Sequence, residues 1–385
     1  MALFDDLNNV MPVGELGIIS EGCPELCDQV NYYISAWRKE RETEHINSLH
    51  FVNYQKDNYI VPSRCSRFGS GEGKGCIDET VRGKDLYIIC DVMNHSMTYK
   101  MFGTENRMSP DDHFANLKRL IAAVGGKAKR INVIMPFLYE SRQHKRTNRE
   151  SLDCALALQE LAQMGVDYIL TFDAHDPRMQ AAIPIKGFDN ILPIYQFIKA
   201  MVRNIKDITF DKDHLMVISP DEGAMWRAVY YANMLELDVG MFYKRRDYTQ
   251  IVNGRNPIIA HEFLGDSIDG KDVIIVDDMI SSGDSLLDVA RQLKDRNARK
   301  VIAAVTFGLF TGGLDAFDQA YKDGLIDYVL TTNLIYQMPE LFTKPYYINV
   351  DMSKYIAILI ESLNHDRSIS SYLDPNMKIK ALLGR

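Results

Sequence analysis

The sequence lacks the features of a nucleic-acid-binding or membrane-bound protein. It has no basic stripe interleaved with aromatic residues, and 44 Lys and Arg against 52 Asp and Glu give a net charge of −8, so nucleic acid is not an expected partner. The first residues, MALFDDLNNV, have neither the basic start nor the apolar core of a signal peptide. No apolar run approaches the ~20 residues that a membrane span needs. These absences predict a cytoplasmic protein that does not associate with membranes.

Paired cysteine motifs and long low-complexity stretches are also absent. The six cysteines all fall in the first half of the chain without CxxC spacing, so we expect buried or inert thiols rather than a zinc site or disulfides. The composition is 46% hydrophobic and 25% charged, with 24 Gly and 13 Pro spread along the chain, which excludes extended disorder. A length of 385 residues suits two domains of usual size.

Short β-branched and apolar runs alternate with amphipathic stretches such as 151–164 and 285–294. This alternation predicts βαβ units, and therefore parallel sheets with helices on both faces. The runs predicted to be buried strands are 87–90, 131–135, 168–171, 216–219, 273–276 and 301–306.

The segment 189–193 is the best candidate for a domain boundary, because it separates two sets of strands of similar number. Two polar segments, 38–58 and 94–109, interrupt the alternation and are expected to form surface insertions. The tail 368–385 is expected to be peripheral. The predicted division of the chain is a first domain over 12–190, a second over 191–350, and a C-terminal helix and tail over 351–385.

The most informative segment is 273–293, which reads VIIVDDMISSGDSLLDVARQL. It combines a buried strand, an acid pair, a Ser/Gly turn and a helix that a capping-box pattern at Ser285 and Asp288 is expected to open. Loop amides and a helix N-terminus can bind a phosphate monoester without cationic side chains. At the end of the strand, Asp277 and Asp278 can accept hydrogen bonds from a vicinal diol or hold Mg²⁺.

This segment resembles the phosphoribosyl-diphosphate motif shared by phosphoribosyltransferases and ribose-phosphate pyrophosphokinases. In both families the acids hold the ribose hydroxyls and the loop holds the 5-phosphate. The resemblance therefore assigns ribose 5-phosphate to Asp277, Asp278, Ser281, Ser282, Gly283, Asp284 and Ser285.

Five distant segments favour the pyrophosphokinases over the transferases. SRFGSGEGKGCIDETVRGKDLYII, from Ser66, resembles a pyrophosphokinase segment that reads RFSDGE, a spacer and NVRG. MPFLYESRQHKR, from Met135, resembles a strand followed by YARQD. GVDYILTFDAHDPRMQAAI, from Gly165, resembles a strand that ends in DLHA. ISPDEGAMWRA, from Ile218, resembles SPD-x-G, and FYKRRD, from Phe242, resembles KRR before a mobile loop.

The matches run in order over roughly 14–363, and the chain is thereby identified as a member of the ribose-phosphate pyrophosphokinase family. The resemblance implies two similar α/β domains of the type I phosphoribosyltransferase kind, each a parallel sheet flanked by helices. The implied activity is transfer of the diphosphate of ATP to ribose 5-phosphate, which gives phosphoribosyl diphosphate and AMP. Members of the family assemble as dimers or hexamers, so a homo-oligomer is expected.

The resemblance also assigns ATP contacts. Arg142 and Gln143 are expected to contact ATP, with Phe68 stacking on adenine and Glu72 nearby. The basic stretch that begins there, 142–149 (RQHKRTNR), suits a small polyanion, although a solvated helix face is the alternative.

The same resemblance places Mg²⁺ on His175 and Asp221, and Mg²⁺ is a hard cation that prefers oxygen donors and tolerates one imidazole. Lys244 and Arg246 are expected to reach over the β-phosphate from a mobile loop. Transfer of a phosphoryl group depends mainly on alignment and on neutralising developing charge, so cations and metal are the core of the implied site.

Three departures from the family pattern keep other functions open. Ser70 stands where an acid helps to read the base, and His144 stands where an acid follows Arg-Gln. The loop 281–285 reads SSGDS where these pyrophosphokinases usually carry DTGGT. One alternative is a catalytically weak regulatory paralogue. The other is a phosphoribosyltransferase, which predicts one such domain and a base-binding hood.

Overall fold

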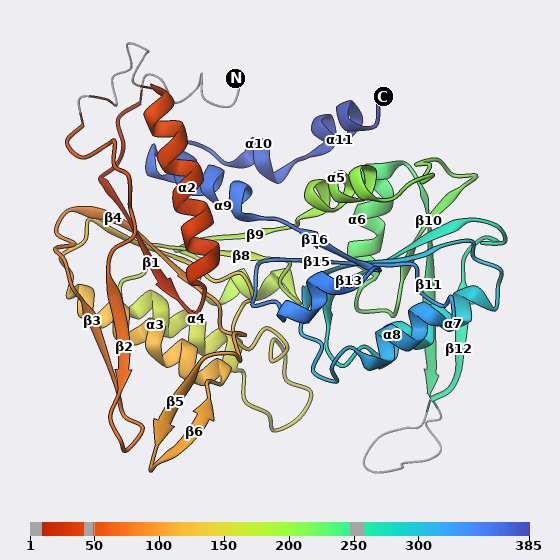
Figure 1. Ribbon diagram of the computed structural model, residues 1–385, viewed down its shortest axis with the longest axis horizontal. Coiled ribbons are helices and arrows are strands. Elements are labelled where there is room, and N and C mark those ends of the chain that lie inside the picture. Colours follow the sequence, from red (N-terminus) through yellow and green to blue (C-terminus); the bar gives the residue numbers. More distant parts are fainter. Residues whose placement is uncertain (1–9, 42–48, 50, 247–257) are drawn as a thin grey trace. The chain divides into compact units, whose positions relative to one another are not determined.

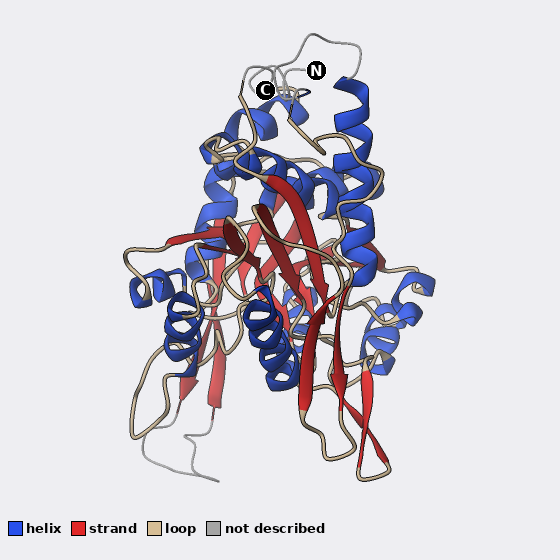
Figure 2. Cartoon of the chain, turned by 90° about the vertical axis from the view of Figure 1, so that its left-hand side faces the viewer, coloured by secondary structure: helices blue, strands red, loops and turns tan. Residues whose placement is uncertain are grey.

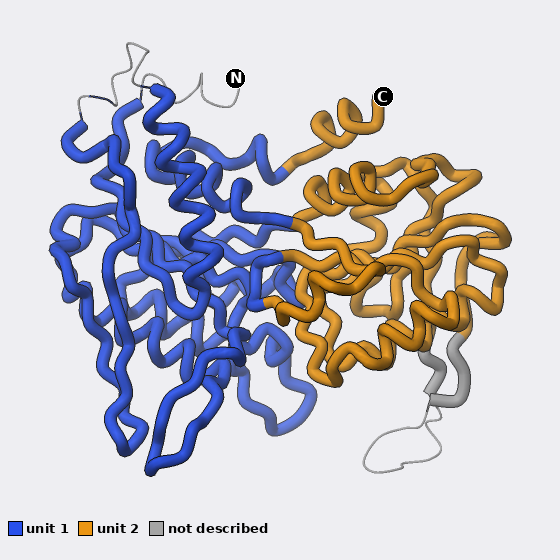
Figure 3. Tube along the Cα trace, viewed as in Figure 1, with its two compact units in different colours: residues 1–192, 333–336, 351–373 blue, residues 193–332, 337–350, 374–385 orange. Residues whose placement is uncertain are grey.

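The computed structural model describes residues 10–41, 49, 51–246 and 258–385. These residues form two compact units, shown in different colours in Figure 3. The chain passes from unit 1 to unit 2 after Leu192, and it later returns to unit 1 twice. Unit 1 contains the chain up to 192 with 333–336 and 351–373, and unit 2 contains 193–332, 337–350 and 374–385. The C-terminal segment is therefore divided between the units rather than forming a piece of its own.

Unit 1 is built on a five-stranded parallel sheet with the strand order β1-β4-β7-β8-β9. Strand β4 is buried along its whole length, because helices cover both faces of the sheet. Helices α2 and α9 lie on one face and α3 and α4 on the other (Figure 1). The elements are β1 (Glu15–Glu21), β4 (Lys84–Cys90), β7 (Arg130–Ile134), β8 (Tyr168–Phe172), β9 (Gly187–Ile191), α2 (Pro24–Glu40), α3 (Pro110–Val124), α4 (Asp153–Gln163), the 3₁₀ helix η3 (Pro177–Ala182), α9 (Ser353–Asn364) and α10 (Ser370–Leu373).

Helix α3 shows how local sequence sets the limits of an element. The Ser109 hydroxyl accepts a hydrogen bond from the Asp112 amide at 3.2 Å, and the Asp112 carboxylate accepts one from the Ser109 amide at 3.0 Å. This reciprocal cap, with Pro110 at the first helical position, fixes the start of the helix. Gly125 ends it in the left-handed conformation, with φ of 59°.

Two hairpins leave the layered body of unit 1 (Figures 1 and 2). The first pairs β2 (Ser63–Arg67) with β3 (Gly73–Ile77) and packs on α3. The second pairs β5 (Thr98–Met101) with β6 (Thr104–Arg107), and it occupies the predicted insertion at 94–109.

The prediction that 38–58 forms a surface insertion is wrong at the first residue of this segment and near its end, where the side chains are buried. The Arg38 side chain is 1% exposed and donates to the Glu361 carboxylate at 2.8 Å. Tyr54 is 2% exposed. Both residues are buried because α9 carries Glu361 back onto α2, which ties the segment 351–373 to unit 1.

Unit 2 is built on a seven-stranded sheet with the order β12-β11-β10-β13-β14-β15-β16, in which only β12 runs antiparallel to its neighbour. Helices α5 and α6 lie on one face and α7 and α8 on the other (Figure 1). The elements are α5 (Ile194–Asn204), β10 (Leu215–Ser219), α6 (Met225–Leu235), β11 (Asp238–Arg246), β12 (Ile258–Leu264), β13 (Asp272–Ile280), α7 (Asp284–Lys294), β14 (Val301–Gly308), α8 (Asp315–Lys322), β15 (Tyr328–Thr332), the 3₁₀ helix η4 (Pro339–Thr343), β16 (Tyr347–Val350) and α11 (Asn376–Leu382).

The α/β prediction is confirmed, since each unit is a largely parallel sheet flanked by helices. All six predicted strands coincide with strands of the structure, namely β4, β7, β8, β10, β13 and β14. Among the residues that the structure describes, no helix is both long and apolar enough to cross a membrane.

Candidate active site

The loop after β13 is shaped by Gly283. This residue has φ of 101°, and a Cβ built on it would lie 2.4 Å from Cε2 of Phe317, so only glycine fits there. The Thr311 amide donates to the Ser281 carbonyl at 2.9 Å and holds the loop against the segment after β14. The amides of the first turn of α7, from Asp284 on, have no acceptor within the helix. A loop and helix N-terminus of this kind can bind a phosphate.

The predicted capping box is wrong. Helix α7 begins at Asp284, one residue before Ser285, and its N-cap is Gly283, which has no side chain to cap it. The physical reason is the left-handed Gly283, whose carbonyl accepts the Leu287 amide at 2.9 Å and starts the helix early. Asp288 instead accepts a hydrogen bond from Gln292 at 3.1 Å. The Asp284 carboxylate lies in the first turn and accepts the Ser282 hydroxyl at 2.8 Å.

The acid pair lies at the carboxyl end of β13, as predicted. The Asp278 amide donates to Oδ1 of Asp277 at 2.9 Å, and Asp278 is 5% exposed. The Arg227 guanidinium lies 3.7 Å from Oδ1 of Asp277. Burial and the adjacent Asp278 carboxylate raise the pKa of Asp277, and Arg227 only partly offsets them. The pair is therefore predisposed to hold a proton, a cation or hydroxyl donors.

Asp221 follows the neighbouring strand β10, and the turn around it fixes its side chain. Oδ1 of Asp221 accepts the amides of Gly223 at 2.9 Å and Ala224 at 3.2 Å. The Ser219 hydroxyl donates to the Asp221 carbonyl at 2.6 Å. A carboxylate held in this way is an oriented oxygen donor for a hard divalent cation.

In unit 1, the loops after β7 and β8 bring His144 and His175 together. Their ring centres are 5.3 Å apart and the rings are inclined by 58°. Nε2 of His144 lies 3.6 Å from the Asp176 carboxylate, which Arg178 holds through Nε at 2.9 Å. The hydrogen bonds from Arg178 lower the pKa of Asp176 to about 2, although burial opposes them. Burial lowers the pKa of His144 and outweighs the opposing effect of Asp176.

The predicted ATP residues lie on two different elements of unit 1. Arg142 is exposed and Gln143 is half-buried in the loop after β7, where the Gln143 amide donates to the Glu140 carbonyl at 2.8 Å. Phe68 and Glu72 face each other across the turn between β2 and β3, with the Phe68 amide donating to the Glu72 carbonyl at 2.8 Å.

In the hairpin turn the Phe68 ring is exposed and can contact a ligand, whereas the Glu72 carboxylate already accepts a hydrogen bond. The Phe68 ring is 56% exposed. The Glu72 carboxylate accepts a hydrogen bond from the Ser70 hydroxyl at 2.7 Å. Ser70 stands where the family pattern places an acid, and here it contacts the acid two residues further along the chain.

Lys244 and Arg246 lie in the last residues of β11 rather than in a loop. Their backbones pair with His261 and Ile258 of β12. Their side chains, and the following segment 247–257, are outside the described residues.

Sequence reasoning missed three charged residues in these clusters. Arg227 lies beside Asp277, and an arginine in the first turn of the helix after β10 is the signal that could have found it. Asp176 and Arg178 support His144, but only their position just after β8 marks them in the sequence.

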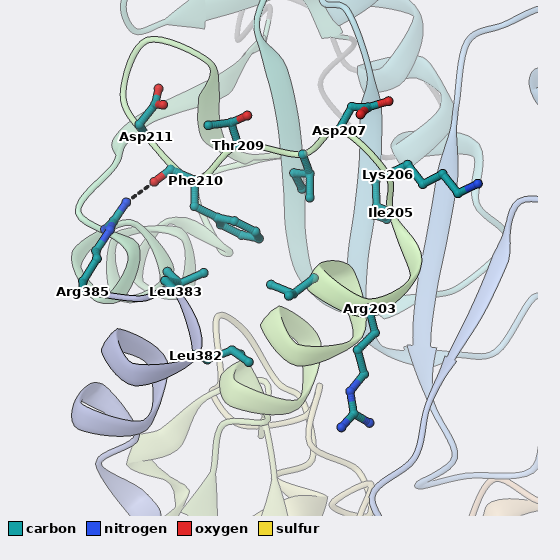
Figure 4. A pocket seen from close by; sticks show the side chains of 12 residues that line it. Arg203, Ile205, Lys206, Asp207, Thr209, Phe210, Asp211, Leu382, Leu383 and Arg385 are labelled. Atoms are coloured by element: carbon teal, nitrogen blue, oxygen red, sulfur yellow. Dashed lines mark hydrogen bonds between the residues drawn. The ribbon is translucent and has the colours of Figure 1, made fainter.

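A cavity of about 830 Å³ lies elsewhere in unit 2, between the end of α5, the segment 205–211 and α11 (Figure 4). The Arg385 side chain crosses it and donates to the Phe210 carbonyl. The segment precedes β10, so the cavity is at the amino end of that strand, whereas ligands of parallel sheets collect at carboxyl ends. No predicted site residue lines it.

Within the described parts of the chain, no cluster of three or more His, Cys, Asp or Glu side chains is placed to hold a metal ion. Asp221 offers oxygen, which fits Mg²⁺, and the neighbourhood of His175 offers imidazole nitrogen. Each donor, taken in its own unit, is of a type that can bind a divalent cation whose other ligands are water or phosphate oxygens.

Two family models match this sequence. The N-terminal domain of ribose phosphate pyrophosphokinase matches residues 22–165, and a phosphoribosyl transferase domain matches residues 187–329.

Curated relatives match over most of their length. The ribose-phosphate pyrophosphokinase of Mycoplasma pneumoniae is 30% identical over 277 residues, which is 71% of this chain and 76% of that protein. The protein of the same name from Vibrio cholerae is 29% identical over 312 residues, which is 80% of this chain and 89% of that protein. The crystal structure of phosphoribosylpyrophosphate synthetase from Mycobacterium smegmatis shares the fold, with a TM-score of 0.70, 22% identity, and coverage of 91% of this chain and 99% of that one.

Proposed function

Because the chain belongs to the ribose-phosphate pyrophosphokinase family, we propose that it transfers the diphosphate of ATP to the C1 hydroxyl of ribose 5-phosphate. The products are phosphoribosyl diphosphate and AMP. In this reaction the C1 oxygen bonds to the β-phosphorus, the bond from that phosphorus to the oxygen of AMP breaks, and the hydroxyl proton passes to solvent.

The observation that carries the proposal is the presence of both domains in one chain. A phosphoribosyltransferase needs only the second domain, whereas this chain matches the pyrophosphokinase N-terminal domain over 22–165 as well. The transferase alternative leaves the first match unexplained. A regulatory paralogue would keep both domains, so only activity separates it from the enzyme.

Unit 2 is proposed to bind ribose 5-phosphate. Asp277 and Asp278 would accept hydrogen bonds from the ribose hydroxyls, and the amides over 281–285 would hold the 5-phosphate. The Arg227 guanidinium, 3.7 Å from Oδ1 of Asp277, would favour the charged form of this carboxylate and thereby its role as an acceptor, against the raised pKa that burial and Asp278 cause.

Unit 1 is proposed to bind ATP. Phe68 would stack on adenine through its exposed ring, with Glu72 beside it, and Arg142 and Gln143 would contact the nucleotide.

Mg²⁺ is the proposed cofactor, and it would neutralise charge on the phosphate oxygens when bound. Asp221 would supply oxygen to it and His175 would supply nitrogen. Lys244 and Arg246 are proposed as the catalytic cations that stabilise charge on the transferring oxygens. Homo-oligomeric assembly, as a dimer or hexamer, and a cytoplasmic location are further proposals from the same family likeness.

The deciding experiment is to incubate the purified chain with Mg²⁺, ATP and ribose 5-phosphate and to measure AMP by chromatography. AMP should form only when both substrates are present, and removing the metal with a chelator should abolish it. An Asp277→Asn, Asp278→Asn double variant should raise KM for ribose 5-phosphate more than KM for ATP.

Two results would replace the proposal. Nucleotide binding with AMP at background would establish the regulatory paralogue. Consumption of phosphoribosyl diphosphate by a purine or pyrimidine base would establish the transferase.

A further inference from the structure

The neighbourhood of His175 contains a second imidazole in a position to share a metal ion. With metal–nitrogen bonds of about 2.1 Å, two imidazoles on one ion have ring centres roughly 4.5 to 5.5 Å apart. The ring centres of His144 and His175 are 5.3 Å apart. The two residues come from different loops, after β7 and after β8, so their proximity is a product of the fold and not of local sequence.

Each nitrogen of His144 has a different environment. Nε2 faces the Asp176 carboxylate at 3.6 Å. Nδ1 is buried and makes no hydrogen bond of normal geometry, with the Ser141 backbone as a polar neighbour of the ring. A buried polar atom without a partner is costly, and a cation would satisfy it.

The surroundings of His144 also match those of a metal ligand. Histidine ligands usually direct their second nitrogen to a carboxylate, which fixes the ring and the tautomer. The Asp176 carboxylate lies 3.6 Å from Nε2 of His144, on the side where such a partner would lie, and it is itself fixed because Arg178 donates to both carboxylate oxygens, with Nε 2.9 and 3.1 Å away. Asp176 also caps η3 by accepting the Arg178 amide at 2.9 Å. The arrangement is a fixed carboxylate near one imidazole nitrogen and a buried second nitrogen that makes no hydrogen bond of normal geometry.

We propose that His144 and His175 form a two-imidazole site that selects a borderline divalent cation, such as Co²⁺ or Zn²⁺, over Mg²⁺. The inference rests on the proposed placement of the metal at His175. A second nitrogen donor favours these cations because imidazole suits them, whereas Mg²⁺ prefers oxygen and retains water. His144 stands where an acid follows Arg-Gln in the resembling family, so the substitution exchanges an oxygen donor for nitrogen.

The test is calorimetric titration of the metal-free full chain with Co²⁺ alone and with Mg²⁺ alone, without nucleotide. X-ray absorption at the cobalt edge then counts the imidazoles on the bound ion. The wild type should show two, and His144→Gln should show one, with Co²⁺ affinity lowered about ten-fold or more. Mg²⁺ affinity should change less than about three-fold. Asp176→Asn should also lower Co²⁺ affinity, by about ten-fold.

A matched control is His214→Gln, because His214 is an exposed histidine whose Nδ1 lies 2.7 Å from the Asp211 carboxylate. It should leave both affinities and the ligand count unchanged. His144→Asn provides a smaller replacement that can still contact Asp176, in case the glutamine variant melts earlier than the wild type.

The inference is overturned if both His144 variants fold and keep the Co²⁺ affinity and imidazole count of the wild type. It is also overturned if they weaken Co²⁺ and Mg²⁺ equally. A chain that releases AMP but binds Co²⁺ independently of His144 refutes the inference alone. A chain that binds Co²⁺ through both histidines but never releases AMP supports the inference and refutes the proposed function.

Discussion

The carboxyl ends of the two parallel sheets present opposite chemistry. In unit 2, Asp221 lies two residues beyond the end of β10, and Asp277 and Asp278 lie in the last residues of β13, before a loop of backbone amides. In unit 1 the loops after β7 and β8 carry two imidazoles and arginine side chains, with His144 and His175 in contact. The strand order alone does not determine what a unit binds. The short loops at the strand ends supply the side chains that do, and they are acidic in unit 2 and rich in imidazole and guanidinium groups in unit 1.

The interiors of the two units also differ. Unit 1 buries the ion pair of Arg38 and Glu361, each with a side chain 1% exposed. Unit 2 joins α7 to its sheet through apolar side chains such as Val289 and Leu293. Replacing one charge of the buried pair should therefore lower the stability of unit 1 far more than removing an exposed ion pair lowers the stability of unit 2.

The largest expected effect is on stability and tests the contrast in the interiors. Glu361→Gln should lower the free energy of unfolding by about 3 to 5 kcal/mol, because it leaves the buried Arg38 uncompensated. The control is Glu236→Gln, which removes surface ion pairs with Lys380 at 3.3 Å and Arg385 at 3.7 Å and should change stability by about 1 kcal/mol or less. Urea melts followed by circular dichroism measure both. Equal losses of unfolding free energy in the two variants would contradict the proposed difference between the interiors of the two units.

The same pair gives a pH dependence with a defined sign. Burial alone would raise the pKa of Glu361, but the Arg38 charge and its neighbours lower it from 4.5 to about 2. A lowered pKa stabilises the folded state above pH 4.5, and that stabilisation is lost as the pH falls towards 2. The stability gap between wild type and Glu361→Gln should accordingly narrow over this interval.

The next prediction tests the contrast between acidic strand ends in unit 2 and basic loops in unit 1, because the proposed catalytic cations belong to unit 2. Lys244→Ala and Arg246→Ala should each lower kcat by at least ~100-fold and change KM far less, since preorganised cations act mainly in the transition state. Steady-state AMP release measures both constants. Lys212→Ala, an exposed lysine 3.6 Å from Asp238, is the control. Full activity in the Lys244 and Arg246 variants would show that these residues are not catalytic, and the cationic side chains of unit 1 would then be the candidates.

A smaller effect sharpens the contrast by testing the amide loop of unit 2. Gly283→Ala combines φ of 101° with a Cβ contact of 2.4 Å to Phe317, so it should cost about 1 to 3 kcal/mol and raise KM for ribose 5-phosphate. KM for ATP should change little. Gly312→Ala is the matched control, because its Cβ would meet nothing closer than the Ser282 carbonyl at 3.4 Å. Equal increases in both KM values would show that the loop does not belong to ribose 5-phosphate alone.

The smallest effect concerns the one acid within that loop. Asp284→Gly should lower KM for ribose 5-phosphate by less than about ten-fold, since it removes a charge near the phosphate. It should also lower the melting temperature slightly, because an acid in the first turn stabilises α7 by about 0.3 to 1 kcal/mol. Parallel kinetic and thermal measurements test both. A much larger gain in affinity with unchanged melting would show that Asp284 faces the phosphate and detunes the site.

The sequence predicted the sheet centres because their strands are continuous apolar runs. Edge strands such as β9 (GFDNI) and β16 (YINV) could not be predicted in this way, since they carry polar residues and are half-buried. The start of α7 was misplaced because a left-handed Gly283 opens it without a side-chain cap.

The site residues also fall into two groups, those that a local motif predicts and those that only the folded chain brings together. Asp277 and Asp278 follow directly from one local motif, so the sequence placed them at the end of β13. The contact of His144 with His175 and Asp176 depends on two loops that meet only in the folded unit. Local pattern carries no information on such a contact, and the same holds for Arg38 with Glu361.

The ion pair of Arg38 with Glu361 imposes an order of events during synthesis. The two residues are 323 positions apart, so at about 5 to 20 residues per second the ribosome needs roughly 15 to 65 s to deliver the second after the first. The sheet of unit 2 ends with β16 at Val350, so it is synthesised in full before Glu361 emerges. The sheet of unit 2 is thus complete before unit 1 can close, and translation arrested between residues 350 and 361 would yield a finished second sheet and an unfinished first unit.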